Sequence, residues 1–180
     1  AVQIGYYSTG GINNNKRIQE VPCPAGSYCT GGEKFDCPSG YYGDTTKQVQ
    51  PVCSGLCRHG HFCDPSNIVG GSTSPTQLKC SVRVIVAALA SSVFCPEGSS
   101  KPQDVDVGHY SFPEGGKGTA TAQWQCVPGY FCVQGVKREC GDISKYCPSG
   151  SKSAQPVPPG SFSIGGTVNT RQATDDCPEG

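Results

Sequence analysis

The feature that most constrains this 180-residue chain is the placement of its 13 cysteines. Four times, a glycine followed by mostly aromatic residues precedes a cysteine by 17 or 18 residues. We call these residues the opening glycine and the marker cysteine, and the pairs are Gly5–Cys23, Gly40–Cys57, Gly108–Cys126 and Gly160–Cys177. Such regular self-similarity indicates tandem internal repeats.

The composition points to covalent staples in place of a thick hydrophobic core. Hydrophobic residues, cysteines included, make up 35% of the chain, and the large aliphatic ones are scattered. Small secreted modules compensate for a thin core with disulfides, which persist only in oxidising compartments. We therefore predict a secreted protein, extracellular or at the cell surface. Its zero net charge offers no basic surface for nucleic acid or anionic membranes.

The stretch between each opening glycine and marker cysteine predicts a β-hairpin. In the third repeat, residues 107–112 and 119–125 are strand-forming segments on either side of a Gly-rich turn. Residues 3–8 with 16–21, and 161–164 with 167–174, repeat the pattern. The predicted fold class is small disulfide-rich β, an elongated tandem array of hairpin-plus-cysteine-knot modules with little helix.

Four modules follow from these boundaries. They cover residues 1–39, 40–107 with an apolar insert at 82–94, 108–159, and 160–180 as the truncated start of a fourth repeat. The apolar insert is too short to span a bilayer, so no membrane span is expected in this segment. The chain also contains no methionine. These observations predict a segment of a longer protein.

The cysteines group into three sets of four. Four cysteines allow three pairings. We expect the first to pair with the third and the second with the fourth, because a bridge within a short string such as CVPGYFC would isolate its aromatic loop. The expected bridges are Cys23–Cys37, Cys29–Cys53, Cys57–Cys80, Cys63–Cys95, Cys126–Cys140 and Cys132–Cys147.

Cys177 is left over. Its place in the repeat makes it the first cysteine of a fourth set, whose other members would lie beyond residue 180. An odd cysteine in a secreted chain also suggests an intermolecular bond or a free thiol. Both readings predict that Cys177 has no partner within these 180 residues.

Neither a metal site nor an active site is expected. The short strings have the spacing C-x5-C, whereas zinc sites commonly use CxxC pairs, which the chain lacks. His59 and His61 are interpreted as loop histidines, and Asp104 and Asp106 lack the further oxygen ligands that calcium needs. No nucleophile elbow, HExxH or phosphate loop is present. We therefore expect no cofactor and no catalysis.

Two further segments are candidates for contacts or modification. The apolar insert is either a local core or a surface for self-association, through Val82, Val84, Ile85, Val86, Leu89, Val93 and Phe94. No Asn-x-Ser/Thr sequon occurs, but the segment around Pro75 is a candidate O-glycan site or a plain flexible loop. Its candidate acceptors are Ser72, Thr73, Ser74 and Thr76.

The strings CPAGSYC, CPSGYYG and CVPGYFC, with the closing CPEG and CPSG, resemble the ephrin-receptor-like and tumour-necrosis-factor-receptor-like cysteine-rich repeats. The resemblance implies an array of disulfide-bonded β modules in an ectodomain. Arrays with GYYS-type openings are also similar to parts of large surface proteins of single-celled eukaryotes, including fibrous flagellar-hair proteins. The long hairpins and the apolar insert depart from the receptor pattern.

Together these features predict a non-catalytic extracellular structural segment that forms a rod or fibre by self-association. Its partners would be copies of itself or other extracellular proteins. The alternative is a receptor-type ectodomain that binds a protein ligand.

Overall fold

A computed structural model describes residues 1–12, 16–68, 70–80, 83–85, 89–91, 93–113 and 119–178, with backbone only at 67, 83–85 and 89–91. The chain divides into two compact units. Unit 1 comprises Ala1–Cys80 and Cys95–Pro102, and unit 2 comprises Ser81–Phe94 and Gln103–Gly180.

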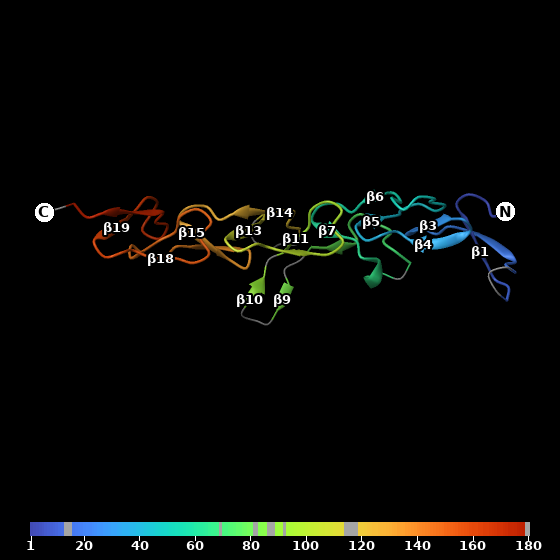
Figure 1. The fold of residues 1–180 in the computed structure, drawn as a ribbon, viewed down its shortest axis with the longest axis horizontal. Coiled ribbons are helices and arrows are strands. Elements are labelled where there is room, and N and C mark those ends of the chain that lie inside the picture. Colours follow the sequence, from blue (N-terminus) through green and yellow to red (C-terminus); the bar gives the residue numbers. More distant parts are fainter. Residues whose placement is uncertain are drawn as a thin grey trace. The chain divides into compact units, whose positions relative to one another are not determined.

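Unit 1 is built from antiparallel hairpins, which appear as short paired arrows in Figure 1. Its hairpins are β1 (Tyr6–Thr9) with β2 (Gln19–Pro22), β3 (Ser27–Thr30) with β4 (Glu33–Asp36), β5 (Tyr41–Tyr42) with β6 (Gly55–Leu56), and β7 (His61–Phe62) with β8 (Leu78–Lys79). A single 3-10 turn, η1 (Pro65–Asn67), is the helical element described in this unit.

Unit 2 follows the same plan. Its hairpins are β9 (Arg83–Ile85) with β10 (Leu89–Ser91), β11 (Val93–Phe94) with β12 (Gln103–Asp104), β13 (His109–Phe112) with β14 (Ala122–Gln125), β15 (Tyr130–Val133) with β16 (Val136–Glu139), β17 (Lys145–Tyr146) with β18 (Gln155–Pro156), and β19 (Ser161–Ile164) with β20 (Ala173–Asp176). Every described sheet has two strands. The predicted small disulfide-rich β class is confirmed, and so are the three long hairpins expected from the sequence.

A glycine turn starts most of these hairpins. In each such turn, the residue after a glycine donates its N–H to the carbonyl three residues earlier, for example His109 to Asp106 at 3.1 Å. The glycines have φ between +74° and +86°, the value that the third residue of a type II turn requires. Seven of them open a hairpin, namely Gly5, Gly26, Gly40, Gly60, Gly108, Gly129 and Gly160, whereas Gly98 and Gly150 make the same turn in the loops of the β11–β12 and β17–β18 hairpins.

A cysteine closes the same hairpins. The N–H of the cysteine after the returning strand donates to the carbonyl of the turn glycine, at 2.8 to 3.0 Å. The pairs are Cys23–Gly5, Cys37–Gly26, Cys57–Gly40, Cys80–Gly60, Cys126–Gly108, Cys140–Gly129 and Cys177–Gly160. The elementary unit is therefore one glycine-to-cysteine hairpin, and each of repeats 1 to 3 contains an opening hairpin followed by a second hairpin.

Sulfur fills the interior. The buried hydrophobic side chains are mostly cysteines, namely Cys23, Cys29, Cys37, Cys57, Cys63, Cys80, Cys95, Cys126, Cys132, Cys140 and Cys147. The others are Val93, Phe94, Tyr110 and Ala120. Two-stranded sheets are marginal alone in water, so the bridges carry stability that a core would otherwise supply.

The twelve cysteines expected in bridges are all bridged, but the predicted pairing is wrong. Each set pairs first with second and third with fourth, with Cα–Cα distances of 5.7 to 6.1 Å. The bridges are Cys23–Cys29, Cys37–Cys53, Cys57–Cys63, Cys80–Cys95, Cys126–Cys132 and Cys140–Cys147. The six crossed pairs do not form, and because the observed bridges follow one another along the chain, the modules are not cysteine knots.

The physical reason for this pairing is visible in the third repeat. The turn from Val127 to Tyr130 reverses the chain between Cys126 and Cys132, so the two cysteines meet directly. The aromatic loop between them is not isolated, because the Cys132 N–H donates to the Ser151 carbonyl at 2.8 Å. Backbone hydrogen bonds thus tie the loop to the rest of the repeat.

The predicted module boundaries do not separate independent pieces. The Cys37–Cys53 bridge crosses the boundary near residue 39. Across the boundary near residue 159, the Cys147 N–H donates to the Arg171 carbonyl at 2.9 Å. Repeats 1 and 2 are therefore joined by a disulfide, and repeats 3 and 4 by a backbone hydrogen bond.

Candidate interaction surfaces

In two repeats the second hairpin lies across the opening hairpin. The Ser8 N–H donates to the Gly32 carbonyl at 2.9 Å, and the Ser111 N–H donates to the Gly135 carbonyl at 3.1 Å. The two serines lie three residues after their opening glycines, and Gly32 and Gly135 lie in the turns of the second hairpins. The same contact thus recurs in repeats 1 and 3.

This crossing buries the aromatic residue beside the serine in repeat 3. Tyr110 is 5% exposed and packs with the Cys126–Cys132 bridge and Tyr130. The Lys137 ammonium lies 5.2 Å from the centre of the Tyr110 ring and 4.9 Å from that of Tyr130. Cation–π contacts of this kind contribute about 0.5–1 kcal/mol at exposed sites.

An aromatic pair on β13 and β14 is exposed. Phe112 and Trp124 stack with ring centres 4.0 Å apart and planes 4° apart, and Trp124 is 50% exposed. The position of Trp124, two before the marker cysteine, is Val, Gly or Asp in the other opening hairpins. The module does not require this pair, which is therefore a candidate contact surface. The pair was not predicted from the sequence, although Trp124 is the single tryptophan of the chain.

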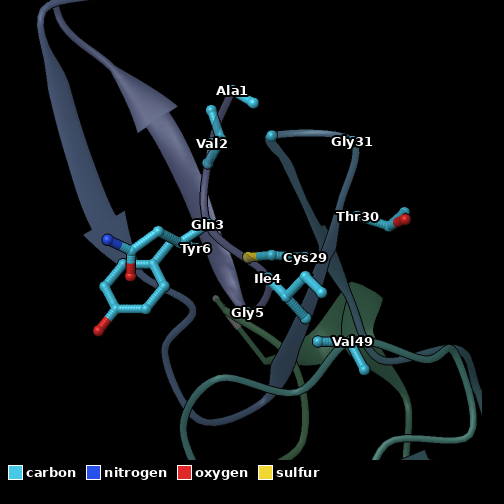
Figure 2. Close-up of a pocket in the computed structure, with 11 residues that line it drawn as sticks. Ala1, Val2, Gln3, Ile4, Gly5, Tyr6, Cys29, Thr30, Gly31 and Val49 are labelled. Atoms are coloured by element: carbon cyan, nitrogen blue, oxygen red, sulfur yellow. The ribbon is translucent and has the colours of Figure 1, made fainter.

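A hollow of about 370 Å³ lies in unit 1, and Figure 2 draws the residues that line it. Val2, Ile4 and Val49 line it together with the Cys29 end of β3. Ile4 is 87% exposed, and the corresponding residue before the next long opening hairpin, Val107, is 77% exposed. The exposure of this position is thus a property of the repeat.

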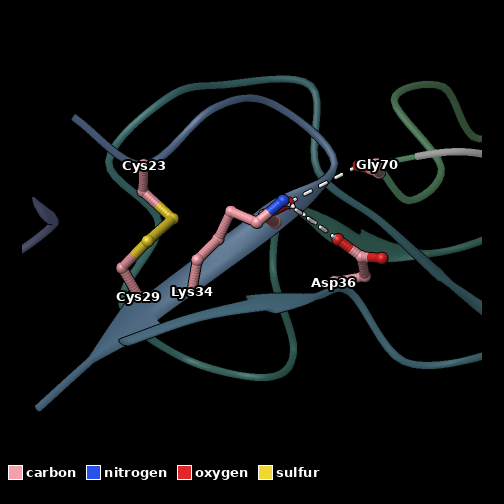
Figure 3. Close-up of polar contacts among 6 residues, drawn as sticks. Cys23, Cys29, Lys34, Asp36 and Gly70 are labelled. Atoms are coloured by element: carbon pink, nitrogen blue, oxygen red, sulfur yellow. Dashed lines mark hydrogen bonds and ion pairs between the residues drawn. A yellow bond between two sulfur atoms is a disulfide. The ribbon is translucent and has the colours of Figure 1, made fainter. Parts of the chain in front are cut away.

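Polar contacts join β3 and β4 to the loop around Gly70 in unit 1 (Figure 3). The Lys34 ammonium lies 3.7 Å from the Asp36 carboxylate, the one ion pair among the described residues. The fully buried Ser27 hydroxyl donates to the same carboxylate at 3.2 Å and lies 3.5 Å from the Gly70 carbonyl. Exposed ion pairs contribute little, so these groups position the loop around Gly70 and offer no reactive centre.

The apolar insert is only partly described. Val93 and Phe94 are buried, so these two residues belong to the interior, and their assignment to a self-association surface is wrong. Val84, Ile85 and Leu89 lie in β9 and β10, where the structure gives the backbone alone. Val82 and Val86 lie outside the described residues.

The candidate O-glycan acceptors differ in access. Thr73 and Thr76 are exposed and Ser74 is half-buried. Ser72 is 1% exposed, and its hydroxyl has no hydrogen-bond partner among the described residues. A sugar transferase cannot reach a buried hydroxyl, so Ser72 is wrong as an acceptor in the folded chain.

The side chains considered as metal ligands do not converge. His61 Nδ1 lies 3.3 Å from the His59 carbonyl, and the Asp106 carboxylate accepts a hydrogen bond from the Gln123 amide at 2.5 Å. Within the described ranges, no three His, Cys, Asp or Glu side chains are placed to hold a metal ion. Hydrogen bonds from the Ser144 hydroxyl and N–H lower the pKa of the exposed Asp142 carboxyl.

Cys177 has no bridge and is exposed. Its N–H donates to the Gly160 carbonyl at 2.8 Å, as the marker cysteines of the other repeats do to theirs. Beside the same opening hairpin lies a hollow of about 480 Å³, lined by Ile143, Val157 and Phe162 with Arg171 and neighbouring serines. The side chains of Ile143 and Phe162 are 60% and 44% exposed.

No protein-family model matches this chain, and no curated protein sequence matches it. Among the residues that the structure describes, no helix has the length and apolar character needed to cross a membrane.

Proposed function

We propose that this chain is a non-catalytic structural repeat segment of an extracellular protein and that it builds a rod or fibre by self-association. The proposal rests on which side chains are buried and which are exposed. Disulfides occupy the interior, while large apolar side chains stay on the surface. Exposed residues of this kind include Ile12 at 82% and Ile18 at 75%, near the tip of the β1–β2 hairpin.

Assembly is the physical consequence of such a surface. Removing apolar area from water contributes about 25 cal/mol per Å², and these side chains find no cover in their own thin modules. The bridges fix each module, and lateral contacts between modules bury the exposed side chains. Six disulfides also favour an oxidising, extracellular setting. Ephrin-receptor-like or tumour-necrosis-factor-receptor-like arrays are the repeat type that the strings resemble.

Electron microscopy of the native material tests this proposal, since a fibre subunit shows helical or lattice order. Sedimentation velocity of the purified chain should show concentration-dependent oligomers. Substituting Ile12→Asp with Ile18→Asp should shift them toward monomer. The matched control, Thr73→Asp with Thr76→Asp, adds the same charge at exposed polar positions and should leave assembly intact. A strictly monomeric chain with ordered hairpins would refute the proposal.

A receptor-type ectodomain is the second candidate, and the exposed Phe112–Trp124 stack favours it. Aromatic side chains are enriched among the residues that dominate binding interfaces. A receptor fragment would stay monomeric and would bind a soluble extracellular protein. Trp124→Ala would then abolish that binding while the β13–β14 hairpin remained folded.

A further inference from the structure

One disulfide of unit 1 differs from the other five in its access to solvent. Eleven of the twelve bridged cysteines are at most 2% exposed, and the exception is Cys53, which is partly exposed. Cys53 also has φ of 47°, a left-handed conformation that residues other than glycine adopt at a cost. Its partner Cys37 is fully buried. This bridge therefore has one cysteine in the interior and one at the surface.

The backbone shows which residue of repeat 1 takes the place of the fourth cysteine. In repeats 2 and 3, the carbonyl of the fourth cysteine accepts the N–H of the glycine that opens the second hairpin. In repeat 1, the equivalent glycine donates to another glycine instead. The pairs are Gly60–Cys95, Gly129–Cys147 and Gly26–Gly43, each at 2.7 Å. Gly43 thus stands where a buried cysteine stands in the other repeats, and the cysteine of repeat 1 lies further along the β5–β6 loop, at position 53.

The space beside Gly43 has the geometry of a bridge. A Cβ added to Gly43 would lie 2.9 Å from the Cys37 sulfur. An S–S bond of about 2.05 Å places the Cβ of one cysteine about 3 Å from the sulfur of the other. The φ of Gly43 lies outside the left-handed region, so a side chain meets no backbone strain there. A cysteine at this position would therefore bridge Cys37 in the interior, as Cys95 and Cys147 bridge their own partners.

Backbone hydrogen bonds hold the β5–β6 loop on repeat 1 independently of its bridge. The Lys47 N–H donates to the Cys23 carbonyl at 2.8 Å, and the Cys29 N–H donates to the Gln48 carbonyl at 2.8 Å. Cys23 and Cys29 are themselves bridged to each other. The loop can thus keep its place on repeat 1 when the bridge from Cys53 opens.

We propose that Cys53 is an exchange site at which a low-molecular-weight thiol forms a reversible mixed disulfide with this chain. The thiolate attacks the Cys53 sulfur, the S–S bond to Cys37 breaks, and its electron pair leaves on the Cys37 sulfur, which takes a proton from water. The step consumes no oxidant, because one disulfide replaces another. The Cys37 thiol, held nearby in the interior, restores the bridge by attacking Cys53 and expelling the small thiol.

Access to sulfur makes the exchange selective. At the other five bridges both cysteines are buried, so an external thiol reaches them only after the module has opened locally. At Cys53 the folded chain already offers an approach, and the left-handed backbone is no longer required once the bridge has opened. The exchange acts on the covalent link between repeats 1 and 2, and it requires no self-association.

Reduced glutathione is the probe, added to the oxidised chain after the exposed Cys177 thiol has been alkylated. Acid stops the reaction, a second alkylating reagent marks the released thiols, and peptide mapping follows each bridge with time. We expect glutathione on Cys53 and a new thiol at Cys37, formed at least about tenfold faster than exchange at any other bridge, because local opening limits the buried ones.

The matched variant combines Gly43→Cys with Cys53→Ser and so moves the cysteine to the buried place that repeats 2 and 3 use. Its bridge from Cys37 to position 43 should exchange as slowly as the other five. Val52→Ala is the control, since it removes an exposed side chain beside Cys53 and leaves the bridge unaltered. This control should retain the fast exchange at Cys53.

Two results would overturn the proposal. Equal rates at all six bridges, or faster exchange at another one, would show that Cys53 has no privileged access. Glutathione found on Cys37 would show that the buried sulfur is the one attacked. If the double variant does not fold, the comparison of the six bridges within the unaltered chain still decides. These outcomes are independent of whether the chain assembles, so failure here is distinguishable from failure of the proposed function.

Discussion

The turn glycines offer the sharpest test of the fold, and Gly108 and Gly160 form a matched pair for it. Their φ angles are +77° and +82°. A Cβ added to Gly108 would lie 2.4 Å from the Gly150 carbonyl oxygen, whereas no described atom lies within 4 Å of a Cβ added to Gly160. Alanine therefore brings conformational strain at both sites and a backbone clash at Gly108 alone.

The magnitudes follow from these two terms. A left-handed conformation costs a non-glycine residue about 1–2 kcal/mol. Alanine also lowers the conformational entropy of the unfolded chain, which stabilises the folded state by about 0.4–1 kcal/mol. Gly160→Ala should therefore cost about 1 kcal/mol. Gly108→Ala must also displace the Gly150 turn, whose N–H donates to the Cys126 carbonyl at 2.7 Å. Losing that hydrogen bond, and leaving its N–H and carbonyl groups unpaired, adds about 2 kcal/mol to the cost of Gly108→Ala.

Native-state hydrogen exchange measures both effects locally, because the marker-cysteine amide of each hairpin donates to its glycine. We expect the Cys177 amide of Gly160→Ala to exchange several-fold faster. The Cys126 amide of Gly108→Ala should exchange faster by about a further factor of 30, which corresponds to about 2 kcal/mol. Equal effects at the two sites would refute the argument that close packing of a turn against a neighbouring carbonyl requires glycine at Gly108.

Three further outcomes are expected. Gln134→Asn should stabilise the β15–β16 hairpin by about 0.5 kcal/mol, because Gln134 has a φ of 51° in a two-residue turn and Asn adopts this conformation more readily. Urea unfolding measures the change, and a loss of stability would contradict the turn assignment. The double substitution Cys140→Ser, Cys147→Ser should cost about 2.5 kcal/mol for its short loop yet leave the marker bridge of repeat 3 intact in peptide maps, whereas crossed pairing would destroy both bridges. Because hydrogen bonds from Ser144 lower the pKa of Asp142 in the folded chain, the stability it contributes is present above its ordinary pKa and is lost as pH falls through the lowered value. The protection factors of the amides in its turn, which correct for the intrinsic pH dependence of exchange, should therefore fall on acidification below about pH 4, and Asp142→Asn should remove this dependence.

The sequence predicted the hairpins well because their signals are local. Alternating side chains flank Gly-rich turns at residues 107–125 and 161–174, and each segment forms the expected ladder. The length of the first repeat was harder to predict, because Lys47 occupies a turn position that is glycine in the next two repeats. Lys47 has φ of 63°, and its N–H donates to the Cys23 carbonyl, as Gly98 and Gly150 donate to the carbonyls of Cys57 and Cys126. A lysine at this position carries no turn signal, so the first repeat looked shorter than it is.

The contact surfaces could not be derived from the sequence because they depend on which hairpin covers which. Phe162 and Tyr110 occupy the same place in their repeats, and only the packing of β15–β16 distinguishes a covered ring from an open one. Val93 and Phe94 looked like part of an exposed apolar insert, yet β11 pairs with β12 and both side chains are buried. Burial in a thin module is decided by one neighbouring hairpin, which hydrophobicity alone does not reveal.

The cysteine pairing failed for a different reason, and the spacing held the signal that would have corrected it. In every complete set the first two cysteines are six residues apart, while the third and fourth are 16, 15 and 7 apart. A bridge that closes across a fixed turn requires a constant loop, since its cysteines must meet at a Cα–Cα distance of about 5.5–6 Å. If the first cysteine paired with the third, the spacing between the first and the second would be free to vary. The invariant six-residue spacing therefore indicates a local bridge, and the variable spacing belongs to the loop that can grow, as it does between Cys80 and Cys95.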